Sequence, residues 1–153
     1  MSTQTAKGNK IQIVLTEGLK SVEYFVQKVM IPGFSFGVTE IPTGSTKLNI
    51  VGDTIDFEDL TVSLILDEDL KAWKEVHADM MQKDPETGNM IPSNREYDIN
   101  IIILSSKNNP ILNMKFKDSK IRNVGGISYD VTTSEELFFD ITFAYDYSTI
   151  EDL

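Results

Sequence analysis

The sequence predicts a mainly β domain, an all-β sandwich or barrel that carries one α-helix packed on its sheet. Apolar and polar residues alternate along most of the chain, which is the period of strands that bury one face. The period changes to steps of three and four residues after Asp67, as in an amphipathic helix. The 153 residues contain no repeat, low-complexity tract or linker, so we expect one domain over 1–153 with eight or nine strands.

The first two predicted strands form a hairpin. Residues 11–15 alternate up to a turn at Glu17-Gly18, and residues 22–26 resume the same period. A third strand, 34–38, lies between breaks at Ile31-Pro32-Gly33 and Ile41-Pro42-Thr43-Gly44. Proline and glycine favour turns, so these breaks are expected to end the neighbouring strands.

The segment Lys47–Trp73 reads as strand, turn, strand and helix. Leu48 and Ile50 mark a strand that is expected to end at a turn at Gly52-Asp53. Residues 60–66 then alternate, with Leu60, Val62, Leu64 and Leu66 on the predicted core face.

The predicted helix is expected to pack on the sheet through an apolar stripe. Its members have helical spacing and are Leu70, Trp73, His77 and Met80. The acids Asp67-Glu68-Asp69 fall in its first turn, where a side-chain cap and the helix dipole favour carboxylates. We therefore assign these acids a structural role in preference to metal binding.

The second half begins with a predicted long loop over residues 83–96. The strand that follows, 97–105, is apolar on both faces, which indicates cover on both sides by the helix or by a partner subunit. Three more strands are expected at 111–117, 127–131 and 138–147. Strands this long would aggregate through free edges, so we expect charged residues or a partner subunit to protect them.

Composition excludes several classes of function. Twenty-four acids against 14 bases leave a net charge of −10, which disfavours binding to nucleic acid or anionic membranes. The absence of cysteine excludes disulfides and thiolate chemistry. Residues 1–9 have no apolar leader segment and are expected to be flexible, and no apolar run approaches the roughly 18 residues of a membrane span. We expect no membrane anchor and a protein used in the cytoplasm where it is made.

We predict no catalytic, cofactor or metal site. His77 is the only histidine and belongs to the packing stripe, so a Ser-His-Asp relay or a multi-histidine metal site lacks its ligands. Gly125-Gly126 is better explained by a turn than by a phosphate loop. Two alternatives stay open. One is an enzyme with paired carboxylates such as Asp56 with Glu58 and Asp59, and the other is a small β-sandwich ligand- or carbohydrate-binding module, a monomer with Trp73 and tyrosines in an exposed cleft.

Several short motifs, in their order along the chain, resemble the tail tube proteins of contractile-tailed bacteriophages of the T-even type. Lys47–Asp53 and Phe57–Val62, followed by a helix with Trp73, are similar to that family's strand, Gly-Asp turn, strand and helix. Asn123-Val124-Gly125 and the strand Phe138–Tyr147 are similar to its Asn-Val-Gly turn and closing strand. Met30-Ile31-Pro32-Gly33 is also similar to its break after the second strand.

The resemblance implies a structural protein that catalyses no reaction. The family's subunits form a hexameric ring with a continuous inner β-barrel, and rings stack into a tube inside a contractile sheath. Partners would be further copies, the sheath protein, and baseplate and tube-terminator proteins, while DNA passes through without specific binding. The implied location is the virion tail, assembled in the host cytoplasm. Baseplate tube initiators, tube-end proteins, contractile injection systems and type VI secretion tubes share the fold, so these roles stay open.

An acidic lining of such a tube would come from outward side chains of the closing strands. The candidates are Asp130, Glu136, Asp140 and Asp146. The alternative is that these acids are solvated on the outer surface.

Overall fold

A computed structural model describes residues 5–15, 19–81, 85–89 and 96–153. The described residues form nine strands and two helices, which confirms the mainly β class. In chain order these are β1 (Ile11–Leu15), α1 (Lys20–Phe25), β2 (Val26–Met30), β3 (Phe34–Thr43), β4 (Thr46–Phe57), β5 (Leu60–Ile65), α2 (Lys71–Met80), β6 (Tyr97–Leu104), β7 (Pro110–Val124), β8 (Phe138–Ala144) and β9 (Tyr147–Asp152).

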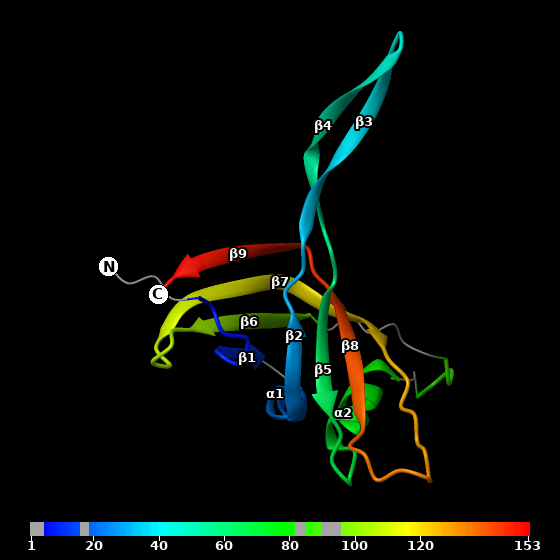
Figure 1. Cartoon of the computed structure of the whole chain (residues 1–153). Coiled ribbons are helices and arrows are strands. Elements are labelled where there is room, and N and C mark those ends of the chain that lie inside the picture. The colour runs from blue at the N-terminus through cyan, green and yellow to red at the C-terminus, as the bar shows by residue number, and fades with distance from the viewer. Residues whose placement is uncertain (1–4, 16–18, 82–84, 90–95) are drawn as a thin grey trace.

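One long strand, β7, organises the sheet. The strand order is β1-β6-β7-β8-β5-β2, and β9 also pairs with β7, with every pair antiparallel. The first part of β7 lies between β6 and β9, while Lys120–Val124 pairs with β8. Asp118 has a left-handed φ of 56° and the ladder is irregular between Ile121 and Asn123. These irregularities accompany a bend that carries the sheet from one layer into a second one that crosses it (Figure 1).

The hydrophobic core lies between the two layers and is closed by the helices. Alternate residues of β5, β6 and β8 point into it, as the period-2 pattern predicts. Its largest fully buried side chains include Tyr97, Phe143, Leu60, Leu64 and Ile101. The strands predicted at 60–66, 97–105 and 111–117 are therefore confirmed. The single strand predicted at 138–147 is instead divided, because β8 ends at Ala144 and the chain bends before β9 begins at Tyr147.

The predicted hairpin of residues 11–15 and 22–26 is wrong. Residues Lys20–Phe25 form α1, and β1 pairs with β6. Leu19 and Val22 are buried and three residues apart, whereas Tyr24 is exposed, which suits a helix and contradicts period 2. The chain thus has two described helices where one was predicted. The predicted turn at Glu17-Gly18 lies outside the described residues.

The predicted turn at Gly52-Asp53 is also wrong, because β4 runs through both residues. Gly52 lies against Gly37, where the β3–β4 ladder has a bulge, and a Cβ on Gly52 would sit 3.0 Å from the Gly37 carbonyl oxygen. Gly52 therefore allows a close approach of two strands. The predicted break at Ile41-Pro42-Thr43-Gly44 shrinks to a turn at Gly44, whose φ is 63°.

Residues 127–131 form no strand, so the strand predicted there is wrong. Asp130 Oδ1 accepts hydrogen bonds from the Thr132 backbone N at 3.0 Å and from Thr132 Oγ1 at 2.6 Å. This local turn interrupts the alternation, since Asp side chains compete with strand pairing for nearby N–H groups. Val131 is fully exposed.

Helix α2 begins at Lys71, four residues later than its acids indicated. Asp67 Oδ1 accepts a hydrogen bond from the Lys71 backbone N at 2.9 Å, so this acid supports the start of the helix as predicted. Leu70 precedes the helix with a left-handed φ of 52°.

Candidate functional site

The part of the chain that the structure describes contains no group of three or more His, Cys, Asp or Glu side chains placed to hold a metal ion. Within the same residues, no helix is long and apolar enough to cross a membrane. The described surface carries a projecting hairpin and several open sheet edges.

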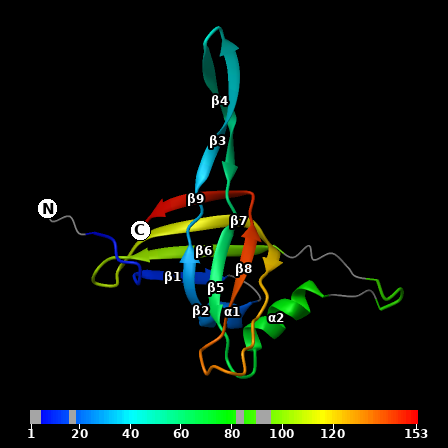
Figure 2. The same cartoon turned by 45° about the vertical axis from the view of Figure 1, so that its right-hand side comes forward.

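Strands β3 and β4 form a long two-stranded hairpin that projects away from both layers (Figures 1 and 2). The hairpin carries an unusual number of exposed apolar side chains. They are Phe34, Phe36, Val38, Ile41, Leu48, Ile50 and Ile55. Single exposed apolar residues are common on proteins, but a group on one arm indicates a contact surface.

The strand register gathers several of these side chains on shared faces. Phe36 is paired with Ile55 near the base, and Ile41 is paired with Leu48 near the tip. Directly opposed residues of an antiparallel pair point to the same face. Each end of the hairpin thus presents apolar side chains of both strands together.

The base of the hairpin is fixed to the body. The Gly33 backbone N donates to Glu58 Oε2 at 3.3 Å, and the Glu58 backbone N donates to the Gly33 carbonyl at 3.0 Å. The rings of Phe57 and Tyr145 lie 5.8 Å apart, and Arg122 Nη1 donates to Asp59 Oδ2. These contacts fix the direction in which the hairpin leaves the fold, so its apolar side chains stay away from the chain's own core.

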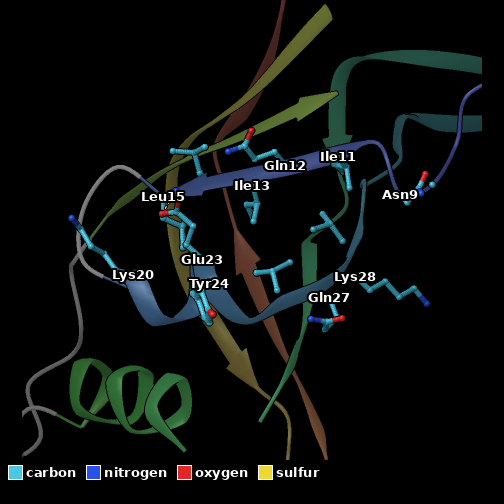
Figure 3. Close-up of a pocket in the computed structure, with 14 residues that line it drawn as sticks. Asn9, Ile11, Gln12, Ile13, Leu15, Lys20, Glu23, Tyr24, Gln27 and Lys28 are labelled. Carbon is cyan, nitrogen blue, oxygen red and sulfur yellow. Dashed lines mark hydrogen bonds between the residues drawn. The ribbon is translucent and has the colours of Figure 1, made fainter. Parts of the chain in front are cut away.

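Three strands of the large sheet leave an edge open on the described part of the chain. β1 pairs only with β6, β2 only with β5 and β9 only with β7, so each has one free edge. Between β1 and β2 lies a groove of about 900 Å³, lined by residues 8–9, 11–15, 20, 23–24 and 26–29 (Figure 3). We call it the β1–β2 groove. Its half-buried apolar residues are Ile11, Val14, Val26 and Val29.

The four candidate lumen residues lie on three different parts of the chain: Asp140 on β8, Asp146 after it, and Asp130 and Glu136 together around one pocket in the segment 125–137. Asp140 is exposed on the outer face of β8, where Ser63 Oγ donates to its Oδ1 at 2.6 Å. Asp146 is exposed at the bend between β8 and β9. Asp130 and Glu136 lie in the segment 125–137, which is not a strand. Hydrogen bonds from the Thr132 side chain and backbone lower the pKa of Asp130.

The candidate packing residues of α2 lie along one border of its buried side. Trp73 and Met80 are half-buried and pack against the core, whereas His77 is exposed and stacks on Trp73 with ring centroids 4.9 Å apart. Leu70 is half-buried just before the helix. The fully buried residues of α2 are Ala72, Val76 and Asp79.

Sequence reasoning missed a buried polar pair between α2 and β6. Tyr97 is almost fully buried and its hydroxyl donates to Asp79 Oδ2. Asp79 was placed on the polar side of the predicted helix, and sequence spacing offers no signal that a tyrosine 18 residues later would meet it. A buried carboxylate needs such a donor because its desolvation is costly.

Removing that donor tests the pair. Tyr97→Phe should lower the free energy of unfolding by about 1–3 kcal/mol, because a buried oxygen of Asp79 loses its hydroxyl partner. Urea denaturation measures the change. Tyr129→Phe, which removes an exposed hydroxyl, is the control and should be neutral. Equal free energies of unfolding for the parent, Tyr97→Phe and Tyr129→Phe would contradict a stabilising hydrogen bond between Tyr97 and Asp79.

Tyr145 lies where the hairpin base meets the body, against the ring of Phe116 at 4.9 Å. Burial raises the pKa of Tyr145 above its usual value of 10.0, and the negative charges of Asp59 and Glu58 raise it further. The folded state therefore favours the neutral phenol.

This shift predicts an alkaline sensitivity. Tyr145 makes its full contribution to the free energy of unfolding below pH about 10, which is the pKa of tyrosine in the unfolded chain. That contribution is lost as the pH rises through the higher pKa of Tyr145 in the folded chain. Tyr145→Phe cannot ionise, so its free energy of unfolding should fall less steeply above pH about 10 than that of the parent. Denaturation measured from pH 8 to 11 checks this, and parallel curves would refute it.

Comparison of the sequence with protein-family models and with curated proteins finds no match. Solved structures do match. The tube-terminating cap of the anti-feeding prophage (AFP) gives a TM-score of 0.69 at 14% identity, covering 100% of this chain and 95% of that chain. The sheath/tube terminator of the PVC extracellular contractile injection system gives 0.69 at 10% identity, covering 99% of both chains. The AFP baseplate gives 0.68 at 11% identity, covering 99% of this chain and 97% of that chain.

These identities are low, so the likeness is one of fold. The chain has the fold of chains in these cap, sheath/tube-terminator and baseplate structures of contractile injection systems. The fold that the predicted resemblance implied is thereby confirmed.

Proposed function

We propose that this protein is a structural subunit of the inner tube of a contractile tail or injection system. The observation that carries the proposal is the fold match, which extends over nearly the whole of this chain and of the matched chains from such assemblies. The subunits form hexameric rings with a continuous inner barrel, the rings stack, and no reaction is catalysed.

The isolated subunit is physically incomplete in a way that ring formation would remedy. The edges of β1 and β2 are unpaired within the described chain, and the hairpin exposes apolar side chains to water. Closing a sheet across subunits removes edges that would otherwise promote aggregation. A free monomer keeps both the unpaired strand edges and the exposed apolar side chains.

The proposed partners follow from this role. Copies of the chain form the tube and the sheath protein surrounds it. Baseplate and terminator proteins lie at its two ends. The tube delivers DNA or an effector, as part of a virion tail or a related particle assembled in the host cytoplasm. The net charge of −10 is consistent with a conduit to which DNA does not adhere.

A tube-end or initiator role is the second candidate. The matched structures come from a cap, a terminator and a baseplate, so the proposal includes a ring that begins or ends the tube. Assembly separates the two roles, because a tube protein polymerises into long stacks whereas an end protein stops at one or a few rings.

A ligand-binding module is the candidate from another class. Trp73 and His77 border a cavity of about 530 Å³ that also touches Met81 and Val124. If the protein is a ligand-binding module, we expect a monomer that binds a ligand in this cavity. That function does not explain the projecting hairpin.

Light scattering over a wide range of protein concentration tests the proposal. We expect rings or polymers, at high concentration or after addition of baseplate components that initiate the tube. A strict monomer under all of these conditions would rule the proposal out, and a monomer that binds ligand beside Trp73 would favour the module.

Charge reversal tests the proposed lumen. Asp140→Lys with Asp146→Lys should still allow assembly, but tubes with a basic lining would retain DNA at low salt and release it at high salt. The matched control is Glu68→Lys with Asp69→Lys, which adds the same charge at exposed positions before α2. DNA retention equal in the two variants would exclude Asp140 and Asp146 from the lumen while leaving the tube proposal standing.

A further inference from the structure

The cavity of about 530 Å³ beside Trp73 lies between α2 and residues 122–127, which are the end of β7 and the chain after it. Figures 1 and 2 both show these two segments side by side, at the end of the molecule opposite to the projecting hairpin. The volume lies within the roughly 300–1,000 Å³ that small-molecule sites have in proteins. Tube assembly as proposed above gives this cavity no occupant.

Two flat walls border the cavity. On the side of α2, Trp73 and His77 stack with their ring centroids 4.9 Å apart, and on the other side Gly125 and Gly126 have no side chains. A Cβ on Gly126 would meet no heavy atom within 4 Å, so the space beside it is open. A gap between aromatic rings and bare backbone suits a planar apolar molecule, because aromatic rings associate by offset stacking of their faces.

Two methionines form an apolar border at the C-terminal end of α2. Met80 is half-buried and Met81 is 51% exposed, and both line the cavity. Methionine side chains are flexible and polarisable, and their sulfur atoms contact aromatic rings favourably. An aromatic ligand that enters the cavity would therefore remove Met81 from water and find an adaptable contact there.

The cavity is basic although the whole chain carries a net charge of −10. Among the described residues that line it none is acidic, and Arg122 supplies a positive charge. Arg122 Nη1 donates to Asp59 Oδ2, which holds the guanidinium in place. A guanidinium has five N–H donors, so donors remain for a carboxylate, sulfonate or phosphate of a ligand. Asp59 offsets part of the positive charge, so we expect the anion to raise the affinity only a few-fold.

We propose that this cavity binds a small planar apolar molecule that carries one anionic group. Its rings lie beside Trp73 and its anion lies beside Arg122. The inference goes beyond the proposed tube function and does not depend on it, because a single chain forms the cavity.

Trp73 is the only tryptophan of the chain, so its fluorescence reports directly on the cavity. The probe is anilinonaphthalene sulfonate, a dye with planar rings and one sulfonate. Phenylnaphthylamine, which has similar rings without the sulfonate, is the uncharged comparison. We expect both dyes to quench the emission of Trp73 in a saturable manner.

Two matched pairs of variants locate the binding. Gly126→Leu fills the open space and should weaken the binding of both dyes by more than about tenfold, because the rings no longer fit. Gly8→Leu is its control, since a Cβ there also meets no heavy atom within 4 Å. Met81→Glu places an acid at the border of the cavity and should weaken the anionic dye further than the uncharged one. Ala78→Glu adds the same charge at an exposed position of α2 outside the described lining, and should leave binding unchanged.

Arg122→Gln tests the anionic group. The variant should weaken anilinonaphthalene sulfonate about two- to fivefold and leave phenylnaphthylamine unchanged, because only the first dye loses a charged partner. Equal losses for the two dyes would overturn Arg122 as the partner of the anion, and the proposed class of ligand with it.

The outcomes separate this inference from the proposed function. Absent quenching, or quenching that Gly126→Leu and Met81→Glu leave at the parental level, would overturn the site without bearing on tube assembly. Quenching that these two variants lose and their two controls keep would support it, whether the protein assembles or stays monomeric. Thermal melting checks that each variant is folded. If Gly126→Leu does not fold, Met81→Glu decides, because Met81 is exposed and contributes little to stability.

Discussion

Replacing Phe36, Leu48 and Ile50 with serine is expected to abolish assembly and leave the monomer folded. The three side chains are 48%, 52% and 45% exposed in the isolated chain, so they contribute little to its stability. Because only about half of each side chain remains to be buried against a second subunit, each would contribute roughly 0.7–1.5 kcal/mol, and losing all three would weaken association by about two to three orders of magnitude. Light scattering measures assembly, and thermal melting shows that the fold is retained.

The matched control replaces Tyr129 and Val131 with serine. These residues are at least as exposed but lie in the segment 125–137, away from the hairpin. The control should assemble like the parent. If the hairpin variant assembles at the parental concentration, the hairpin is not the contact surface.

The largest effect on folding is expected from Phe143→Ala. Phe143 is fully buried on β8, and its ring lies 6.5 Å from that of Tyr97 in an edge-to-face arrangement. Truncating a buried phenylalanine costs about 3–5 kcal/mol, a large part of the 5–15 kcal/mol that stabilises a typical domain. Urea denaturation should show the loss directly.

Phe138→Ala is the control on the same strand. Phe138 points to the outer face and is 52% exposed, so its truncation should change the free energy of unfolding far less. Similar losses for the two variants would contradict the assignment of β8's core face.

Strands that bury one face were predictable from sequence. On β5 and β8 the alternation of Leu60, Val62 and Leu64, and of Phe139, Ile141 and Phe143, corresponds to the buried positions. In such strands local pattern and tertiary environment agree, so the pattern is sufficient.

Features set by distant contacts were not predictable. Lys20–Phe25 reads as a strand by period but forms α1, which packs beside α2 and buries Val22. Five or six residues carry too little periodicity to separate the two structures, and tertiary packing decides. The bend of β7 near Asp118 likewise depends on which strands flank it.

The candidate site was only partly accessible from sequence. The strand over 34–38 was predicted, but Gly52 was interpreted as a turn because glycine usually marks one. Its role is instead a close approach to Gly37 within one long hairpin. The pairing that leaves β1 and β2 with free edges is a property of the whole sheet, which no local pattern records.

Negative-stain electron microscopy of the purified protein tests directly whether the chain forms a tube. We expect sixfold rings with a central channel, alone or stacked into tubes, at high concentration or with baseplate components added. Single particles of about 17.2 kDa under every one of these conditions would contradict it.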